Sequence, residues 1–176
     1  APVRGAARVA NCTASAGGGV AAAGAGSQLK LEGVSRVERN NASQRMPGLW
    51  GDGGGVAASA GAAVSVTGDS KLAENRARVG GAMSLSRNAS ATLSDRAELA
   101  SNAARDGGGG FYLRSGASAR LVGSARVLGN QAFGASANGG GAMLESGPRL
   151  VLGAAASVRR NNATGFGGGV SLDTLA

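Results

Sequence analysis

A constant separation between two recurring motifs constrains the fold of this chain more than any other feature. A glycine doublet precedes an apolar or small residue six times, and an asparagine stands three positions after a hydrophobic residue five times. From the second glycine to the next asparagine the separation is 21, 20, 21, 20 and 20 residues, whereas the onward connector measures 15, 6, 8, 11 and 8. A fixed body with a variable connector predicts repeating units whose extra length is confined to one corner. The doublets begin at Gly18, Gly54, Gly80, Gly109, Gly140 and Gly168.

Within each body, apolar residues two positions apart flank a residue that is polar in four of the five cases. Period-two alternation over short runs, separated by turn residues, predicts half-buried strands. Helix is disfavoured because glycine recurs too often within each unit. The alternating pairs are Leu29/Leu31, Val64/Val66, Ala91/Leu93, Ala119/Leu121 and Leu150/Leu152.

These strands predict an all-β fold, a single-stranded parallel β-helix with three short strands in each coil. We expect about five to six coils of roughly 28 residues, because no single unit can bury its apolar face alone. Stacked coils place like residues above one another, so small apolar residues can fill a narrow core. The prediction treats residues 1–176 as one solenoid segment of a longer protein, with repeats at about 17–52, 53–79, 80–106, 107–138, 139–166 and 167–176.

The asparagines are predicted to stack at one corner of the solenoid. Asparagine tolerates left-handed backbone and bonds to backbone groups at turns, and stacked amides can also bond to one another. Glycine permits positive φ and close approach of neighbouring coils. The predicted ladder comprises Asn40, Asn75, Asn102, Asn130 and Asn161.

The paired motifs, GGAM or GGGV and VERN, LAEN, LASN, VLGN or VRRN, resemble the repeats of chlamydial polymorphic outer-membrane proteins. The resemblance extends from about residue 17 to residue 172, although Val or Leu stands where that family has Phe. It implies a right-handed β-helix of a cell-surface protein, often an adhesin. The Val and Leu residues indicate a slimmer core and a distant branch.

The residue types give little support to catalysis. The chain has no histidine, and its ten acids occupy different phases of the repeat, so we expect no enzyme, no metal site and no cofactor. The net charge of +8 permits weak attraction to anionic polysaccharide, but no nucleic-acid-binding signature is present. No apolar run is long enough to span a bilayer, and the single cysteine, Cys12, is predicted to be a buried free thiol.

Four asparagines begin N-glycosylation sequons. Two directly follow ladder asparagines and one lies in a predicted turn, so their side chains are expected to point outward. Occupied sequons would indicate a eukaryotic secretory-pathway protein, and the alternative is that they are turn residues of a bacterial protein. The candidates are Asn11, Asn41, Asn88 and Asn162.

The longest connector carries Met46, Leu49 and Trp50, which cannot all enter a narrow coil. It either folds back over the core or forms a lateral docking edge for another chain. Leu49, Trp50, Phe133 and Phe166 are the candidate partner contacts. A charged outward row, Arg36, Lys71, Glu98 and Arg126, is interpreted as a solvated face, with binding of acidic polysaccharide as the alternative.

These features predict a non-catalytic structural or adhesive module of an extracellular or cell-surface glycoprotein assembly. Its expected partners are other protein chains of that assembly or other parts of its own chain. Anionic polysaccharide is a further candidate partner. We expect no nucleic acid partner and no membrane insertion. The alternatives are a carbohydrate-active β-helix protein and a bacterial autotransporter passenger adhesin.

Overall fold

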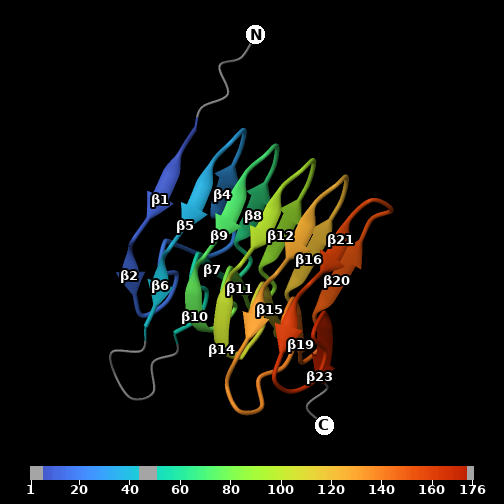
Figure 1. The fold of residues 1–176 in the computed structure, drawn as a ribbon. Helices are drawn as coiled ribbons and strands as arrows, with labels where there is room; N and C mark the ends of the chain where they lie inside the picture. Colours follow the sequence, from blue (N-terminus) through green and yellow to red (C-terminus); the bar gives the residue numbers. More distant parts are fainter. Residues whose placement is uncertain (1–5, 44–50, 174–176) are drawn as a thin grey trace.

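The chain folds into a solenoid of parallel strands, which a computed structural model describes for residues 6–43 and 51–173 (Figure 1). About six turns stack along one axis, and equivalent residues are roughly 28 positions apart, as Met83 pairs with Phe111. No helix occurs among the described residues. The expected all-β solenoid is therefore confirmed.

Two of the four sheets carry apolar positions identified in the sequence: the alternating pairs lie on sheet D, and the hydrophobic residue three positions before each ladder asparagine lies on sheet A. Sheet A contains β1 (Arg8–Ala10), β5 (Arg36–Glu38), β9 (Lys71–Ala73), β13 (Glu98–Ala100), β17 (Arg126–Leu128) and β21 (Ser157–Arg159). Sheet D contains β4 (Gln28–Leu31), β8 (Ala63–Val66), β12 (Ser90–Leu93), β16 (Ser118–Leu121) and β20 (Arg149–Leu152).

The strands that follow the glycine motif form a third sheet. Sheet C contains β3 (Val20–Ala23), β7 (Val56–Ser59), β11 (Met83–Leu85), β15 (Phe111–Arg114), β19 (Ala142–Glu145) and β23 (Val170–Asp173).

A fourth strand accompanies the three expected in each coil. It begins directly after the asparagine corner, and two-residue members such as β6 are too short to show alternation in the sequence. Sheet B contains β2 (Thr13–Ala14), β6 (Asn41–Ala42), β10 (Arg76–Val79), β14 (Ala103–Gly107), β18 (Gln131–Ala132) and β22 (Asn162–Ala163).

The strand pairing corrects the alignment of one glycine doublet. Val56 pairs with Met83 and Met83 with Phe111, so the residue equivalent to Val56 and Phe111 in this coil is Met83, not Ala82. Gly80 therefore corresponds to Gly53, and both have positive φ. The third glycine of the other coils is replaced by Ala82, which hid the shift in the sequence.

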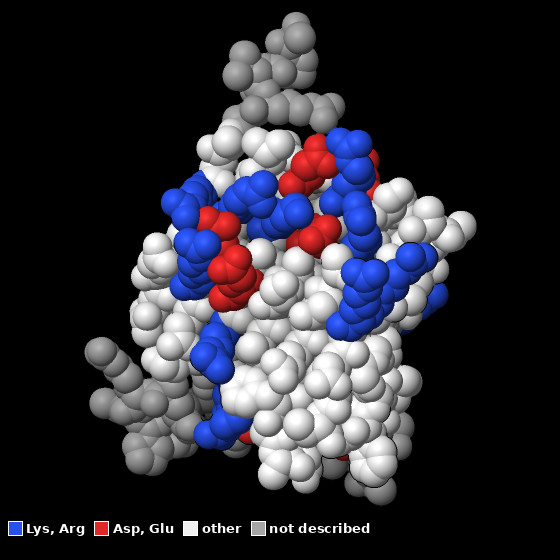
Figure 2. All heavy atoms as spheres, viewed as in Figure 1, with Lys and Arg blue, Asp and Glu red and all other residues white. Residues whose placement is uncertain are grey.

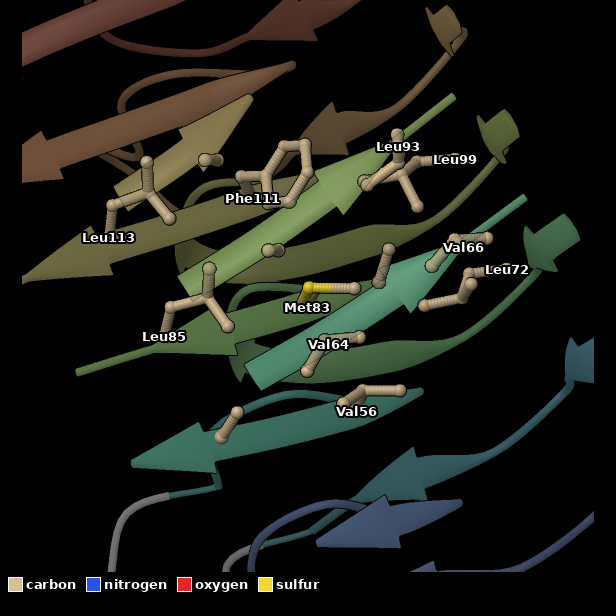
Figure 3. Close-up of a cluster of buried hydrophobic side chains, with 14 of the residues drawn as sticks. Val56, Val64, Val66, Leu72, Met83, Leu85, Leu93, Leu99, Phe111 and Leu113 are labelled. Carbon is tan, nitrogen blue, oxygen red and sulfur yellow. The ribbon is translucent and has the colours of Figure 1, made fainter. Parts of the chain in front are cut away.

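The core lies between sheets A, C and D and is built from stacked columns of like residues (Figure 3). Val66, Leu93 and Leu121 succeed one another in register on sheet D and are fully buried. Leu72, Leu99 and Val127 form the facing column on sheet A. Burial of each such side chain contributes about 1.5–3 kcal/mol to the free energy of folding. The stacked columns therefore stabilise the fold although the chain has few large apolar residues.

Candidate functional site

The five predicted ladder asparagines form one hydrogen-bonded column. Each side-chain amide donates to Oδ1 of the asparagine in the next coil, at 3.0 Å for Asn40–Asn75, 2.9 Å for Asn75–Asn102, 2.9 Å for Asn102–Asn130 and 3.0 Å for Asn130–Asn161. The same Oδ1 atoms accept backbone N–H groups from the preceding coil. These amides serve the framework, since their donors and acceptors are already occupied.

Glycine and asparagine motifs contact each other, although they are about 20 residues apart in sequence. A Cβ atom added to Gly55 would lie 3.0 Å from Nδ2 of Asn75, and one added to Gly141 would lie 2.9 Å from Nδ2 of Asn161. A Cβ on Gly54 would lie 2.5 Å from the carbonyl oxygens of Arg76 and Gly81. The glycines thus leave room for the amide column and for the adjacent strand of sheet B.

The left-handed backbone at this corner belongs to the residue before each ladder asparagine. Arg39, Glu74, Ser101 and Arg160 have φ between 54° and 56°, and Gly129 has φ 63°. None of the ladder asparagines has positive φ. Tolerance of left-handed backbone is therefore the wrong reason for asparagine here, and amide hydrogen bonding is the contribution seen.

Cys12 occupies the ladder position of the first described coil. Its backbone N–H donates to Oδ1 of Asn40 at 3.0 Å, as the backbone of each ladder asparagine does to the next. The expectation of a buried thiol is wrong, because Cys12 is exposed. Among the described residues, the coil that contains Asn40 covers Cys12 on one side.

All four sequon asparagines are exposed: Asn11, Asn41, Asn88 and Asn162. Asn41 and Asn162 lie on the outward side of sheet B, in the column that also carries Arg76 and Gln131. Asn11 and Asn88 lie at corners with φ of 57° and 62°.

The candidate contact residues are not arranged as a single stacked edge within the described chain. Phe133 is half-buried, with the guanidinium of Arg76 5.1 Å from its ring centroid. Phe166 is 79% exposed and lies beside Asn138, a different position of the coil. Leu49 and Trp50 lie outside the described residues.

The charged row on sheet A is in register and partly self-neutralised. Arg36, Lys71, Glu98 and Arg126 are successive partners. Glu98 lies 3.5 Å from Lys71 and 4.0 Å from Arg126. Figure 2 shows basic and acidic side chains interleaved on the face where sheet A lies in front. This interleaving fits a solvated face better than an anion-binding face.

A half-buried charge network crosses the corner between sheets B and C. Arg78 donates to Asp106 at 2.7 Å and to Asp52 at 3.5 Å, and Arg114 donates to Asp52 at 3.3 Å. Burial raises the pKa of the Asp52 carboxyl, and Arg114 and Arg78 oppose that rise. The network was missed in the sequence because its members come from different coils and different phases.

Next to this network, Tyr112 donates its hydroxyl to the Glu145 carboxylate. Burial and this contact raise the pKa of Tyr112 above its ordinary value, so its phenol stays protonated. Val79 and Met143 pack against Tyr112 in a small second apolar cluster.

A groove of about 180 Å³ opens beside the network on the outside of sheet B. We call it the arginine groove. It is lined by Asn41, Ala42, Arg76, Ala77, Arg78, Arg105 and Phe133.

A second hollow of about 220 Å³ shares Arg105 with the arginine groove. Its other lining residues are Asp106 and 134–137. Together the two adjoining hollows are lined by charged, polar and aromatic groups.

Comparison of the chain with protein-family models, curated proteins and solved structures found no match in any of the three. Within residues 6–43 and 51–173, no helix has the length and apolarity needed to cross a bilayer. Within the same ranges, no three Cys, Asp or Glu side chains gather closely enough to hold a metal ion.

Proposed function

We propose that the chain is a structural or adhesive β-solenoid module of an extracellular or cell-surface glycoprotein assembly. The observation that carries the proposal is the in-register stack of about six turns. The recurring Gly and Asn motifs are engaged within that stack, so the variable outward residues are left for recognition.

The stack has the properties of a rigid spacer. Coils about 4.8 Å apart are joined by four sheets and by the amide column, so successive coils are bonded to one another at several places around the perimeter. A rigid body of this kind holds lateral side chains at regular heights, which suits multivalent contact with a polymer or with another chain.

The four exposed sequons support placement outside the cell, because an oligosaccharide can be attached there without entering the core. The resemblance to chlamydial polymorphic outer-membrane repeats supports the same placement, and a bacterial autotransporter passenger is the corresponding alternative. A carbohydrate-cleaving solenoid is the alternative from another class, favoured by the buried Asp52 and Tyr112 and the half-buried Arg114.

Surface labelling tests the placement. An antibody raised against the purified module should stain intact, unpermeabilised cells of the source organism. Staining seen only after permeabilisation would overturn it.

Incubating the module with a panel of acidic and neutral polysaccharides tests the non-catalytic assignment. We expect the polymer length to stay constant, as measured by size-exclusion chromatography. Shortened chains that depend on Asp52 would instead establish the enzymatic alternative.

A further inference from the structure

We propose that the arginine groove and the adjoining hollow bind an oligosaccharide bearing carboxylate or sulfate groups. The inference deepens the proposed function, on which it rests, by assigning the adhesive contact to one site and one ligand class. The two hollows measure about 180 and 220 Å³ and share Arg105. Each is smaller than a typical pocket for a drug-sized molecule, so together they suit successive sugar units of an extended chain.

The charge of the site favours an anion. Arg76, Arg78 and Arg105 line the two hollows, whereas Asp106 is the one carboxylate among their lining residues. Arg78 and Arg105 both pair with Asp106, at 2.7 and 2.8 Å. Within the part of the chain that the structure describes, Arg76 has no carboxylate within 4.0 Å. A guanidinium binds carboxylate or sulfate through two parallel hydrogen bonds, so Arg76 and the exposed edge of Arg105 are the expected contacts.

The remaining lining groups fit a sugar ring. Phe133 lines the groove with an aromatic ring of the kind that packs against the C–H face of a pyranose, and the Arg76 guanidinium lies over that ring, 5.1 Å from its centroid. The amide of Asn41 and the hydroxyl of Ser136 add hydrogen-bonding groups for ring hydroxyls. An apolar face, polar donors and cations therefore converge within one concavity.

An acidic peptide fits less well, because extended peptides gain much of their affinity by pairing with a free strand edge. In sheet B, β14 is already paired with β10 on one side and β18 on the other. Along β14 the groove consequently offers side chains and no free main-chain edge.

Asn41 connects the groove to glycosylation. It is exposed, begins a sequon, and lines the arginine groove next to Arg76. A glycan attached to Asn41 would cover the site, so occupancy of that sequon would switch the contact off.

Binding of tetragalacturonic acid to the unglycosylated protein, measured by isothermal titration calorimetry at low salt, tests the inference. The uncharged methyl ester of the tetrasaccharide is the ligand control, and a sulfated tetrasaccharide distinguishes the two anions. We expect one of the acidic ligands to bind, the ester to bind at least about tenfold more weakly, and the affinity to fall with salt.

Arg76→Gln and Phe133→Leu should each reduce that affinity about fivefold to tenfold. Arg120→Gln, an equal charge change at an exposed position of β16, is the matched control and should change it less than twofold. Thermal unfolding of each variant verifies that the solenoid is intact.

Equal losses of affinity in Arg76→Gln and Arg120→Gln would show that binding depends on overall charge alone. That result would contradict the proposed site. Equal binding of an oligoglutamate would overturn the ligand class, and absence of binding by both acidic tetrasaccharides would overturn the inference itself. Any of these results leaves surface labelling, and with it the proposed function, to be judged separately.

Discussion

The side-chain amide of Asn75 donates a 2.9 Å hydrogen bond to Oδ1 of Asn102 in the next coil, and the backbone N–H of Asn75 donates to the same oxygen at 2.9 Å. Asn102 in turn donates to the carbonyl of Leu72 and to Oδ1 of Asn130. Both asparagines are 1% exposed. A single side chain therefore fixes two neighbouring coils.

Asn102→Ala is expected to lower the free energy of unfolding by about 2–4 kcal/mol, because it leaves buried donors of Asn75 without an acceptor. Urea titration followed by circular dichroism measures the change. Asn162→Ala, at the exposed position that follows a ladder asparagine, should cost less than about 0.5 kcal/mol. Equal losses in the two variants would contradict the ladder's role.

Cys12→Asn should extend the amide column by one coil. Asn40 already accepts the backbone N–H of residue 12, and a new amide at that position can donate to the same Oδ1 as in the other coils. We expect a gain of about 0.5–1 kcal/mol in the free energy of unfolding. Cys12→Ser removes the thiol without adding an amide, and a similar gain in that variant would disprove the explanation.

Gly54→Ala and Gly55→Ala are predicted to differ, although they are adjacent. The new methyl of Gly54→Ala meets carbonyl oxygens of Arg76 and Gly81 at 2.5 Å, which side-chain movement cannot relieve. We expect a loss of about 2–3 kcal/mol. A Cβ on Gly55 would lie 2.7 Å from the carbonyl oxygen of Ala82 and 3.0 Å from Nδ2 of Asn75. The equivalent position of the next coil accommodates Ala82, so Gly55→Ala should cost less than Gly54→Ala, about 1–2 kcal/mol. Thermal unfolding of the two variants measures the difference, and equal thermal midpoints would contradict the prediction.

Ser101→Gly is expected to stabilise the chain by about 0.5–1 kcal/mol, because Ser101 holds φ at 54° and glycine removes that strain. Gly129 holds the equivalent place one coil later. Gly129→Ala is the reciprocal variant and should lose a similar amount. A loss in both variants would indicate that the serine side chain matters more than backbone strain.

The loss of folding stability at acidic pH should depend on Asp106. Partial burial acts to raise the pKa of Asp106, but hydrogen bonds and charge from Arg105 and Arg78 outweigh it, so the pKa lies below the ordinary 3.8. Its stabilisation is thus complete above the unfolded-state pKa and is lost as pH falls through the folded one.

Asp106→Asn should therefore show a smaller drop in thermal midpoint than the parent chain between about pH 7 and about pH 3. Asp52, whose pKa is raised by burial, acts in the opposite direction and does not account for that drop. Parallel curves for the two proteins would exclude the Asp106 contribution.

The strands that could be predicted from the sequence are those in which similar residues occupy equivalent positions of successive coils. Val66, Leu93 and Leu121 are equivalent in register, so the spacing of their motifs in the chain is the spacing of coils in space. Sheet B was not predicted, because β6 and β18 are two residues long and lie in the connector of variable length. The arginine groove was not predicted for a related reason. Arg105 and Phe133 each stand three positions after a ladder asparagine but differ in residue type, and Arg76 stands one position after such an asparagine, so no shared motif marks the groove.

Each bond of the amide column joins Nδ2 of one ladder asparagine to Oδ1 of the equivalent residue in the next coil, so every junction along the column is alike. Removing or duplicating one whole unit rejoins the same donors with the same acceptors, so unequal recombination between repeats yields another foldable protein. Copy number is then free to drift, while any cavity assembled from several consecutive units is rebuilt or erased by the same event.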